Sequence, residues 1–180
     1  MKQDVEEIVE FISTRQPTSH GAILTPCLVG CSGTGKSARI RQWSSKVGMP
    51  YHCVLPATGL PEDFLGIPKV SGTRLQWALP EWAAEATKNP CIIHLDEVDK
   101  IDHDRAAVLL TLLSSREIRG FRFHKDTRIV CSMQPVDPEL WNANETMRAI
   151  VARMVFIPIP SPWNAFGIDL SEFEKPAISL

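Results

Sequence analysis

Several features that assign a protein to a class at sight are missing from this chain of 180 residues. It has no run near the roughly 18 apolar residues that a membrane-spanning helix needs. Its first residues, MKQDVEEIVEFI, are acidic and amphipathic, unlike a secretory signal peptide. The net charge is -2, and no basic stripe indicates nucleic-acid binding. These absences predict a cytoplasmic protein without a membrane segment.

Cysteine is scarce and odd in number, with five widely spread residues. Cys27, Cys91 and Cys131 lie in or beside apolar runs, so we expect them to be reduced residues of the core. Cys27 and Cys31 are four positions apart, but no second pair of Cys or His stands at ligand spacing. The lack of a second ligand pair argues against a zinc site.

Short apolar runs alternate with helical patterns along the chain, which predicts an α/β domain with a mainly parallel sheet. The stretch 56–80 is rich in Gly and Pro and predicts a small hairpin over 69–77, turning at Ser71 and Gly72, but no core helix. We expect an N-terminal helix and linker over 1–20, a core over 21–160 with a hairpin insert near 64–77, and an irregular tail over 161–180. The expected helices cover residues 5–12, 36–47, 80–88, 104–115 and 145–153, and the expected strands cover 23–29, 51–55, 91–95, 128–132 and 155–157.

The stretch LVGCSGTGKSARI has the GxxxxGK[ST] spacing of a phosphate-binding loop between an apolar strand and a helix. Glycines let the backbone wrap phosphates closely, and its N–H groups then form an anion site at the start of the helix. Lys36 is expected to reach the β- and γ-phosphates of ATP, and Ser37 to hold Mg²⁺. The residues expected to contact the nucleotide are Gly30, Cys31, Ser32, Gly33, Thr34, Gly35, Lys36, Ser37 and Ala38.

A second motif, CIIHLDEVDK, is an apolar strand that ends in two adjacent acids. Buried charges at a strand end are costly unless they meet a cation or do chemistry. Asp96 is expected to bind Mg²⁺, and Glu97 to polarise the attacking water of a hydrolase. The alternative is that both acids only cap the following loop. His94 interrupts the apolar run and is expected to be a hydrogen-bonded core histidine rather than a ligand.

Two weaker motifs follow. In RIVCSMQP, the amide of Gln134 follows a strand and could sense the γ-phosphate or position water, although an exposed loop glutamine is the default interpretation. In TMRAIVARMVF, Arg148 and Arg153 end a helix that runs into a strand. In oligomeric ATPases such an arginine enters the neighbouring subunit's site and stabilises transition-state charge. The alternative is that both arginines are solvated helix residues.

These four elements, in this order, resemble an AAA+ ATPase, and their details look most like the MoxR branch. The resemblance implies a P-loop NTPase fold, with Gly30 to Ser37 as the Walker A loop and Asp96 and Glu97 as Walker B. Gln134 then stands where the family usually has the Asn of sensor 1. The matching segments are GCSGTGKS, LPEDFLGIP with LQWALPEWAAEA, IIHLDEVDK, AAVLLTLLSSREIRGFRF, TRIVCSMQP and ARMVFIPIP.

The resemblance also implies an arginine finger at Arg153, with Arg148 as second choice, and an insert around 64–77 that faces the surface or pore of a ring. AAA+ modules carry a C-terminal helical lid, and the proline-rich residues after Pro158 predict no such lid in this chain. The leading hypothesis is a Mg-ATP-dependent ATPase that assembles as a homo-oligomeric ring, for example a hexamer, and remodels a protein partner. The alternative is a scaffold or switch that binds ATP with little hydrolysis. The absence of NKxD and LSGGQ segments argues against a GTPase and an ABC-type ATPase.

Overall fold

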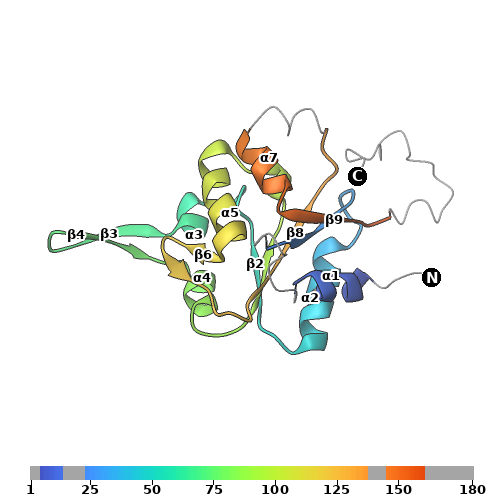
Figure 1. Ribbon diagram of the computed structural model, residues 1–180, viewed down its shortest axis with the longest axis horizontal. Helices are drawn as coiled ribbons and strands as arrows, with labels where there is room; N and C mark the ends of the chain where they lie inside the picture. Colours follow the sequence, from blue (N-terminus) through green and yellow to red (C-terminus); the bar gives the residue numbers. More distant parts are fainter. Residues whose placement is uncertain (1–4, 14–22, 138–144, 161–180) are drawn as a thin grey trace.

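A central sheet of parallel strands organises the protein. The computed structural model describes residues 5–13, 23–137 and 145–160, drawn as coloured ribbon in Figure 1. Every pairing within the sheet is parallel, as the alternation of strands and helices predicted. The sheet has the order β2-β5-β8-β1-β9, with β1 at Thr25–Val29, β2 at Tyr51–Val54, β5 at Ile92–Leu95, β8 at Arg128–Met133 and β9 at Met154–Pro158.

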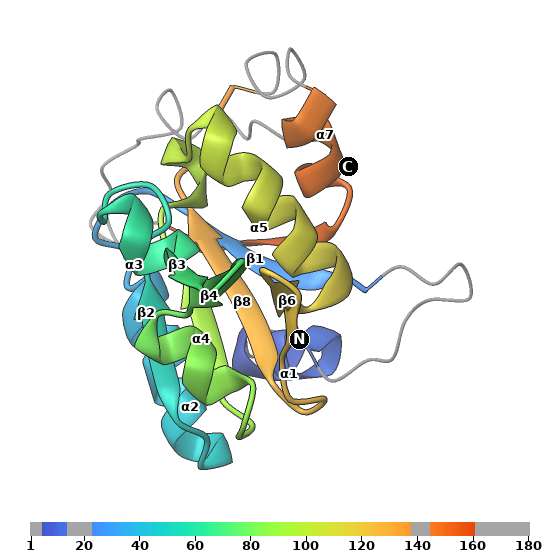
Figure 2. The same cartoon turned by 90° about the vertical axis from the view of Figure 1, so that its left-hand side faces the viewer.

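Helices cover both faces of this sheet, which confirms the expected sandwich (Figures 1 and 2). Helices α1 (Val5–Ser13) and α2 (Lys36–Val47) cover one face, where Leu28, Ile40 and Val130 form part of one apolar cluster. The other face carries the larger cluster. The elements that cover this second face are α3 (Pro61–Leu65), α4 (Glu81–Ala86), the 3-10 helix η1 (Val98–Lys100), α5 (His103–Ser115) and α7 (Glu145–Val151).

The three inner strands, β5, β8 and β1, are mostly apolar because they are buried on both faces, as parallel strands between helices must be. Cys27, Cys91 and Cys131 are each 0% exposed, which confirms that they belong to the core. In parallel strands the carboxyl ends share one edge of the sheet. The phosphate-loop segment after β1, the acid pair after β5 and the loop after β8 therefore meet at that edge.

The prediction that the stretch 56–80 contains no core helix is wrong. Helix α3 occupies Pro61–Leu65, and Phe64 in it is 1% exposed. Proline and glycine are compatible with this helix because Pro61 stands in its first turn and Gly66 ends it with φ +77°. The aromatic ring of Phe64 stacks against Trp82 of α4, with ring centroids 6.3 Å apart.

The expected hairpin is present and projects from the body of the molecule (Figure 1). Strand β3 (Ile67–Ser71) pairs with β4 (Arg74–Ala78), so the loop residues are Gly72 and Thr73 rather than Ser71 and Gly72. Gly72 has φ +62°, a conformation that two-residue hairpin loops require and glycine adopts without strain.

A second hairpin was not predicted from the sequence. It joins β6 (Glu117–Ile118) to β7 (Phe121–Arg122) through Arg119 and Gly120, which have φ values of +52° and +83°. Strands of two residues are too short to give a periodic signal. The guanidinium of Arg119 lies 3.9 Å from the ring centroid of Trp77, so the two hairpins contact each other.

Most other boundaries agree within two or three residues, and α2 ends at Gly48 as expected. The expected tail over 161–180, with the question of the lid, lies outside the described residues, as does the linker from residue 14 to 21. Among the residues that the structure describes, no helix combines the length and apolar character needed to cross a membrane.

Candidate nucleotide-binding site

The loop between β1 and α2 has the backbone shape that its glycines predicted. Gly33 and Gly35 have φ values of +79° and +81°, and Gly35 is the N-cap of α2. Gly30 is needed for a different reason, because a Cβ atom there would lie 2.9 Å from the backbone oxygen of Ile159. The loop is thus curved by two glycines and held against the chain after β9 by the third.

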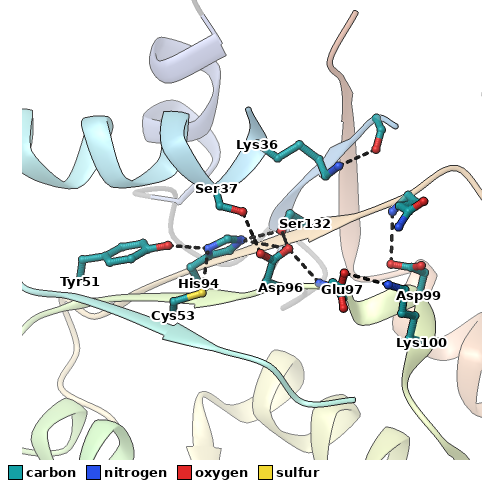
Figure 3. Close-up of polar contacts among 12 residues, drawn as sticks. Lys36, Ser37, Tyr51, Cys53, His94, Asp96, Glu97, Asp99, Lys100 and Ser132 are labelled. Atoms are coloured by element: carbon teal, nitrogen blue, oxygen red, sulfur yellow. Dashed lines mark hydrogen bonds and ion pairs between the residues drawn. The ribbon is translucent and has the colours of Figure 1, made fainter. Parts of the chain in front are cut away.

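Lys36 lies in the curve of this loop (Figure 3). Its Nζ donates hydrogen bonds to the carbonyl oxygens of Gly30 at 2.6 Å and Cys31 at 2.9 Å. Burial lowers the pKa of the Lys36 ammonium, although nearby acids such as Asp96 act against that shift. The ammonium therefore rests on neutral carbonyl groups, which an anionic ligand can replace.

Ser37 and Asp96 meet although they are 59 residues apart in the sequence. The Ser37 hydroxyl donates to Oδ2 of Asp96 at 2.8 Å, while the Ser132 hydroxyl and the Glu97 amide donate to Oδ1 at 2.5 and 3.0 Å. Burial acts to raise the pKa of the Asp96 carboxyl, but the hydrogen bonds from Ser132 and Ser37 outweigh it and keep the pKa below its usual value. Asp96 is thus a fixed carboxylate.

Glu97 has an unusual backbone for a non-glycine residue, with φ +56°. Such left-handed residues are uncommon and concentrate at functional sites. Its side chain is 34% exposed, and Oε1 accepts a hydrogen bond from Lys100 Nζ at 2.8 Å. The next acid, Asp99, accepts a hydrogen bond from the backbone N–H of Gln134 at 3.2 Å. The turn after β5 is therefore tied to the loop after β8.

One cavity of about 280 Å³ brings most of the predicted side chains together. Lys36, Ser37, Asp96, Glu97 and Gln134 all line it. The other lining residues are Ser32, Gly33, Gly35, Ala38 and Met133.

Five predicted residues lie outside this lining. Gly30, Cys31 and Thr34 shape the loop behind the cavity, where the hydroxyl and the amide of Thr34 both donate to the Cys31 carbonyl oxygen. The two arginines, Arg148 and Arg153, are not among the cavity-lining residues of the described chain.

Arg153 instead bonds back to helix α7, which precedes it. Its Nη1 donates to the carbonyl oxygen of Ala149 at 2.6 Å, and Arg148 is exposed. An arginine-finger role of Arg153 or Arg148 in a neighbouring subunit stays a prediction.

His94 is buried and hydrogen-bonded, as expected of a core histidine, and its contacts lead to residues that sequence reasoning missed. Its Nδ1 lies 2.8 Å from the hydroxyl of Tyr51, and its Nε2 lies 2.6 Å from the hydroxyl of Ser132. Ser132 also bonds Asp96, so both contribute to the site from the core side. The sequence signal that could have found them is the alternation of side chains along a strand. Polar residues at alternate positions of adjacent buried strands point to the same face of the sheet.

A family model described as AAA domain (dynein-related subfamily) matches residues 26–154. The chain is 29% identical over 112 residues to the ATP-dependent zinc metalloprotease FtsH of Halothermothrix orenii, covering 61% of this chain and 17% of that protein. It is 33% identical over 112 residues to FtsH of Alkalihalophilus pseudofirmus, covering 60% and 15%. The chain thus spans only about a sixth of the length of these relatives.

Solved structures share the fold. A crystal structure of NtrX from Brucella abortus has a TM-score of 0.57 at 22% identity, covering 89% of this chain and 38% of that one. A structure of NtrX in complex with ATP has a TM-score of 0.53 at 22% identity, covering 88% and 36%. At this identity the likeness establishes the α/β P-loop architecture.

Proposed function

The chain belongs to the AAA domain family (dynein-related subfamily), and from this premise we propose that it binds Mg-ATP in the cavity between the loop and the strand ends. We propose further that it hydrolyses ATP within a homo-oligomeric ring and uses the cycle to remodel or activate a protein partner. The names of the FtsH relatives, which describe ATP-dependent proteins, support ATP as the nucleotide. The cytoplasm as its compartment stays a prediction.

One observation carries the proposal. The ends of two strands, β5 and β8, and the start of helix α2 deliver Lys36, Ser37, Asp96, Glu97 and Gln134 to a single cavity. The cavity carries an ammonium and loop amides on one side, which suit a polyphosphate, and carboxylates on the other, which suit a cation. A cavity that merely filled a packing gap has no reason to collect these groups.

The side chains fit Mg²⁺. A hydroxyl from Ser37 and a carboxylate from Asp96 are hard oxygen donors, which Mg²⁺ prefers over the sulfur and nitrogen donors that zinc accepts. Bound there, Mg²⁺ neutralises charge that develops on the phosphates. Lys36 exchanges its two carbonyl partners for phosphate oxygens, and Glu97 orients a water molecule for attack. Gln134, whose backbone N–H is held by Asp99, then places its side-chain amide toward the γ-phosphate or that water.

The finer parts of the proposal rest on the resemblance. We assign the chain to the MoxR-like branch on the segments quoted above, and Arg153 to the site of a neighbouring subunit. The hydrogen bond from Arg153 to the Ala149 carbonyl of α7 is a single contact with a neutral group. The hairpin β3–β4 supports a contact surface for other proteins, because Val70 and Leu75 are 81% and 64% exposed.

Steady-state ATP turnover tests the proposal. We expect the parent protein to hydrolyse ATP with Mg²⁺, Lys36→Ala to lose binding, and Glu97→Gln to bind without turnover. Turnover per subunit should rise with protein concentration, because Arg153 acts across an interface. In mixtures, Arg153→Ala should lower the turnover of a parent subunit, and the same loss with Arg148→Ala in its place would assign this role to Arg148. Absence of turnover at every concentration would exclude the enzyme.

A scaffold or switch that binds ATP with little hydrolysis is the second candidate. Two observations favour it: Glu97 is paired with Lys100, and Arg153 is bonded to a carbonyl of the preceding helix α7. In this case calorimetry finds ATP binding, turnover stays near the blank, and affinity for a partner depends on the nucleotide. The two candidates thus differ in turnover and agree in binding.

A further inference from the structure

Three polar side chains cross one face of the apolar sheet and end at Asp96. In parallel strands, residues in register point to the same face and alternate residues share it. Cys53 is in register with His94, and His94 with Val130, so Tyr51, His94 and Ser132 all point to the face under α1 and α2. His94 and Ser132 are both 0% exposed. Polar groups at that depth are costly unless they are hydrogen-bonded.

The hydrogen bonds among them can run in only one direction. An ionised carboxylate only accepts, so Ser132 donates its single proton to Asp96 at 2.5 Å. The Ser132 oxygen must then accept from Nε2 of His94 at 2.6 Å, and this nitrogen carries the ring proton. A neutral imidazole carries one proton, so Nδ1 is then the acceptor, and it accepts from the Tyr51 hydroxyl at 2.8 Å, with the Cys53 thiol 3.7 Å away.

This path acts on the side of Asp96 that faces away from Ser37. One carboxylate oxygen accepts from Ser37, and the other accepts from Ser132 (Figure 3). A serine hydroxyl has several rotamers and can turn toward its own backbone. The N–H of His94 holds the Ser132 oxygen in the one position from which it reaches Asp96. Tyr51 in turn keeps the ring in the tautomer that presents this N–H.

We propose that Tyr51, His94 and Ser132 form a positioning relay that holds the Asp96 carboxylate in the orientation for Mg²⁺ binding beside Ser37. The inference rests on the proposed Mg-ATP site and adds residues to it that lie outside the cavity. Partners behind a metal ligand that fix its orientation commonly contribute 10- to 100-fold in metal affinity, so the relay has a measurable consequence.

Nitrogen NMR of the parent protein tests the relay without nucleotide or metal. Long-range proton–nitrogen correlations distinguish the two neutral tautomers of histidine, and the His94 signals are those that disappear in His94→Gln. We expect a neutral ring protonated at Nε2 at pH 7. A ring protonated at Nδ1 would overturn the relay whatever the protein does with ATP.

Calorimetry then tests its consequence. In His94→Leu and Ser132→Ala, the Mg²⁺ concentration that half-saturates binding in the presence of ATP should rise roughly tenfold. Binding of ATP in EDTA should stay at the parent value, because the loop and Lys36 are unchanged. His94→Gln keeps an N–H donor near the Nε2 position and should lie closer to the parent than His94→Leu does.

Two further comparisons keep the test decisive. The double variant His94→Leu with Ser132→Ala should be no weaker than the worse single variant, since both break one path. Tyr51→Phe removes only a hydroxyl and serves if a core variant fails to fold. Unchanged Mg²⁺ dependence in folded variants, or additive losses, would refute the relay. A parent protein that binds no ATP at all would instead refute the proposed function, and the tautomer would still decide the relay.

Discussion

Two glycines of the phosphate loop are required for different physical reasons, and substitution can separate these reasons. In Gly30→Ala, the new Cβ meets the Ile159 backbone oxygen at 2.9 Å and the Thr34 hydroxyl at 3.1 Å. A backbone atom cannot move aside cheaply, so we expect a loss of roughly 1–3 kcal/mol in the free energy of unfolding, as for other overpacked sites. At about 3 °C per kcal/mol for a chain of this size, the melting temperature falls by roughly 3–9 °C.

Gly33 provides the matched control. A Cβ there meets nothing within 4 Å, but φ is +79°. Alanine in the left-handed region costs roughly 1–2 kcal/mol, so Gly33→Ala should lower the free energy of unfolding by about as much as Gly30→Ala does. Asparagine tolerates this region better than alanine. Gly33→Asn should therefore be more stable than Gly33→Ala, whereas Gly30→Asn should be no better than Gly30→Ala.

Thermal and urea unfolding of the four variants measures these differences. When both methods agree, they give the change in the free energy of unfolding. Gly30→Ala should also bind ATP more weakly, because Lys36 contacts the Gly30 carbonyl. If Gly30→Ala is as stable as the parent, the close approach of the loop to Ile159 is wrong. If asparagine rescues position 30, the requirement there is conformational and not steric.

Two further predictions concern charges near the site. The pKa of His94 is about 4 in the folded protein, below 6.5 for a free histidine, so the unfolded chain binds more protons in that window. The free energy of unfolding should thus fall by about 2 kcal/mol from pH 7 to pH 5. Urea unfolding measures this fall in the parent and in His94→Gln, and an equal fall in both would contradict the prediction. Lys100→Ala frees Glu97 from its ion pair and should raise ATP turnover without changing ATP affinity in EDTA; a lowered turnover would show that Lys100 assists Glu97.

Local sequence was sufficient where short-range geometry decides the outcome. The GxxxxGK[ST] spacing predicted the loop and its helix, because only glycine adopts φ near +80° without strain at Gly33 and Gly35. The apolar strand before Asp96 and Glu97 predicted that both acids reach the edge of the sheet. Helix α3 does not follow from local composition, because Pro61 and Gly66 usually interrupt helices, whereas here they stand at the two ends of one.

Consecutive residues are enough to predict a parallel α/β domain with a phosphate loop and an acid pair. The pairs of distant side chains that meet became visible only in the folded chain: Ser37 with Asp96, Gln134 with Asp99, and Tyr51 through His94 to Ser132. The physical reason is strand order and register. Which strands lie side by side, and at what offset, depends on packing against both helical layers, and no single segment of the chain contains that information.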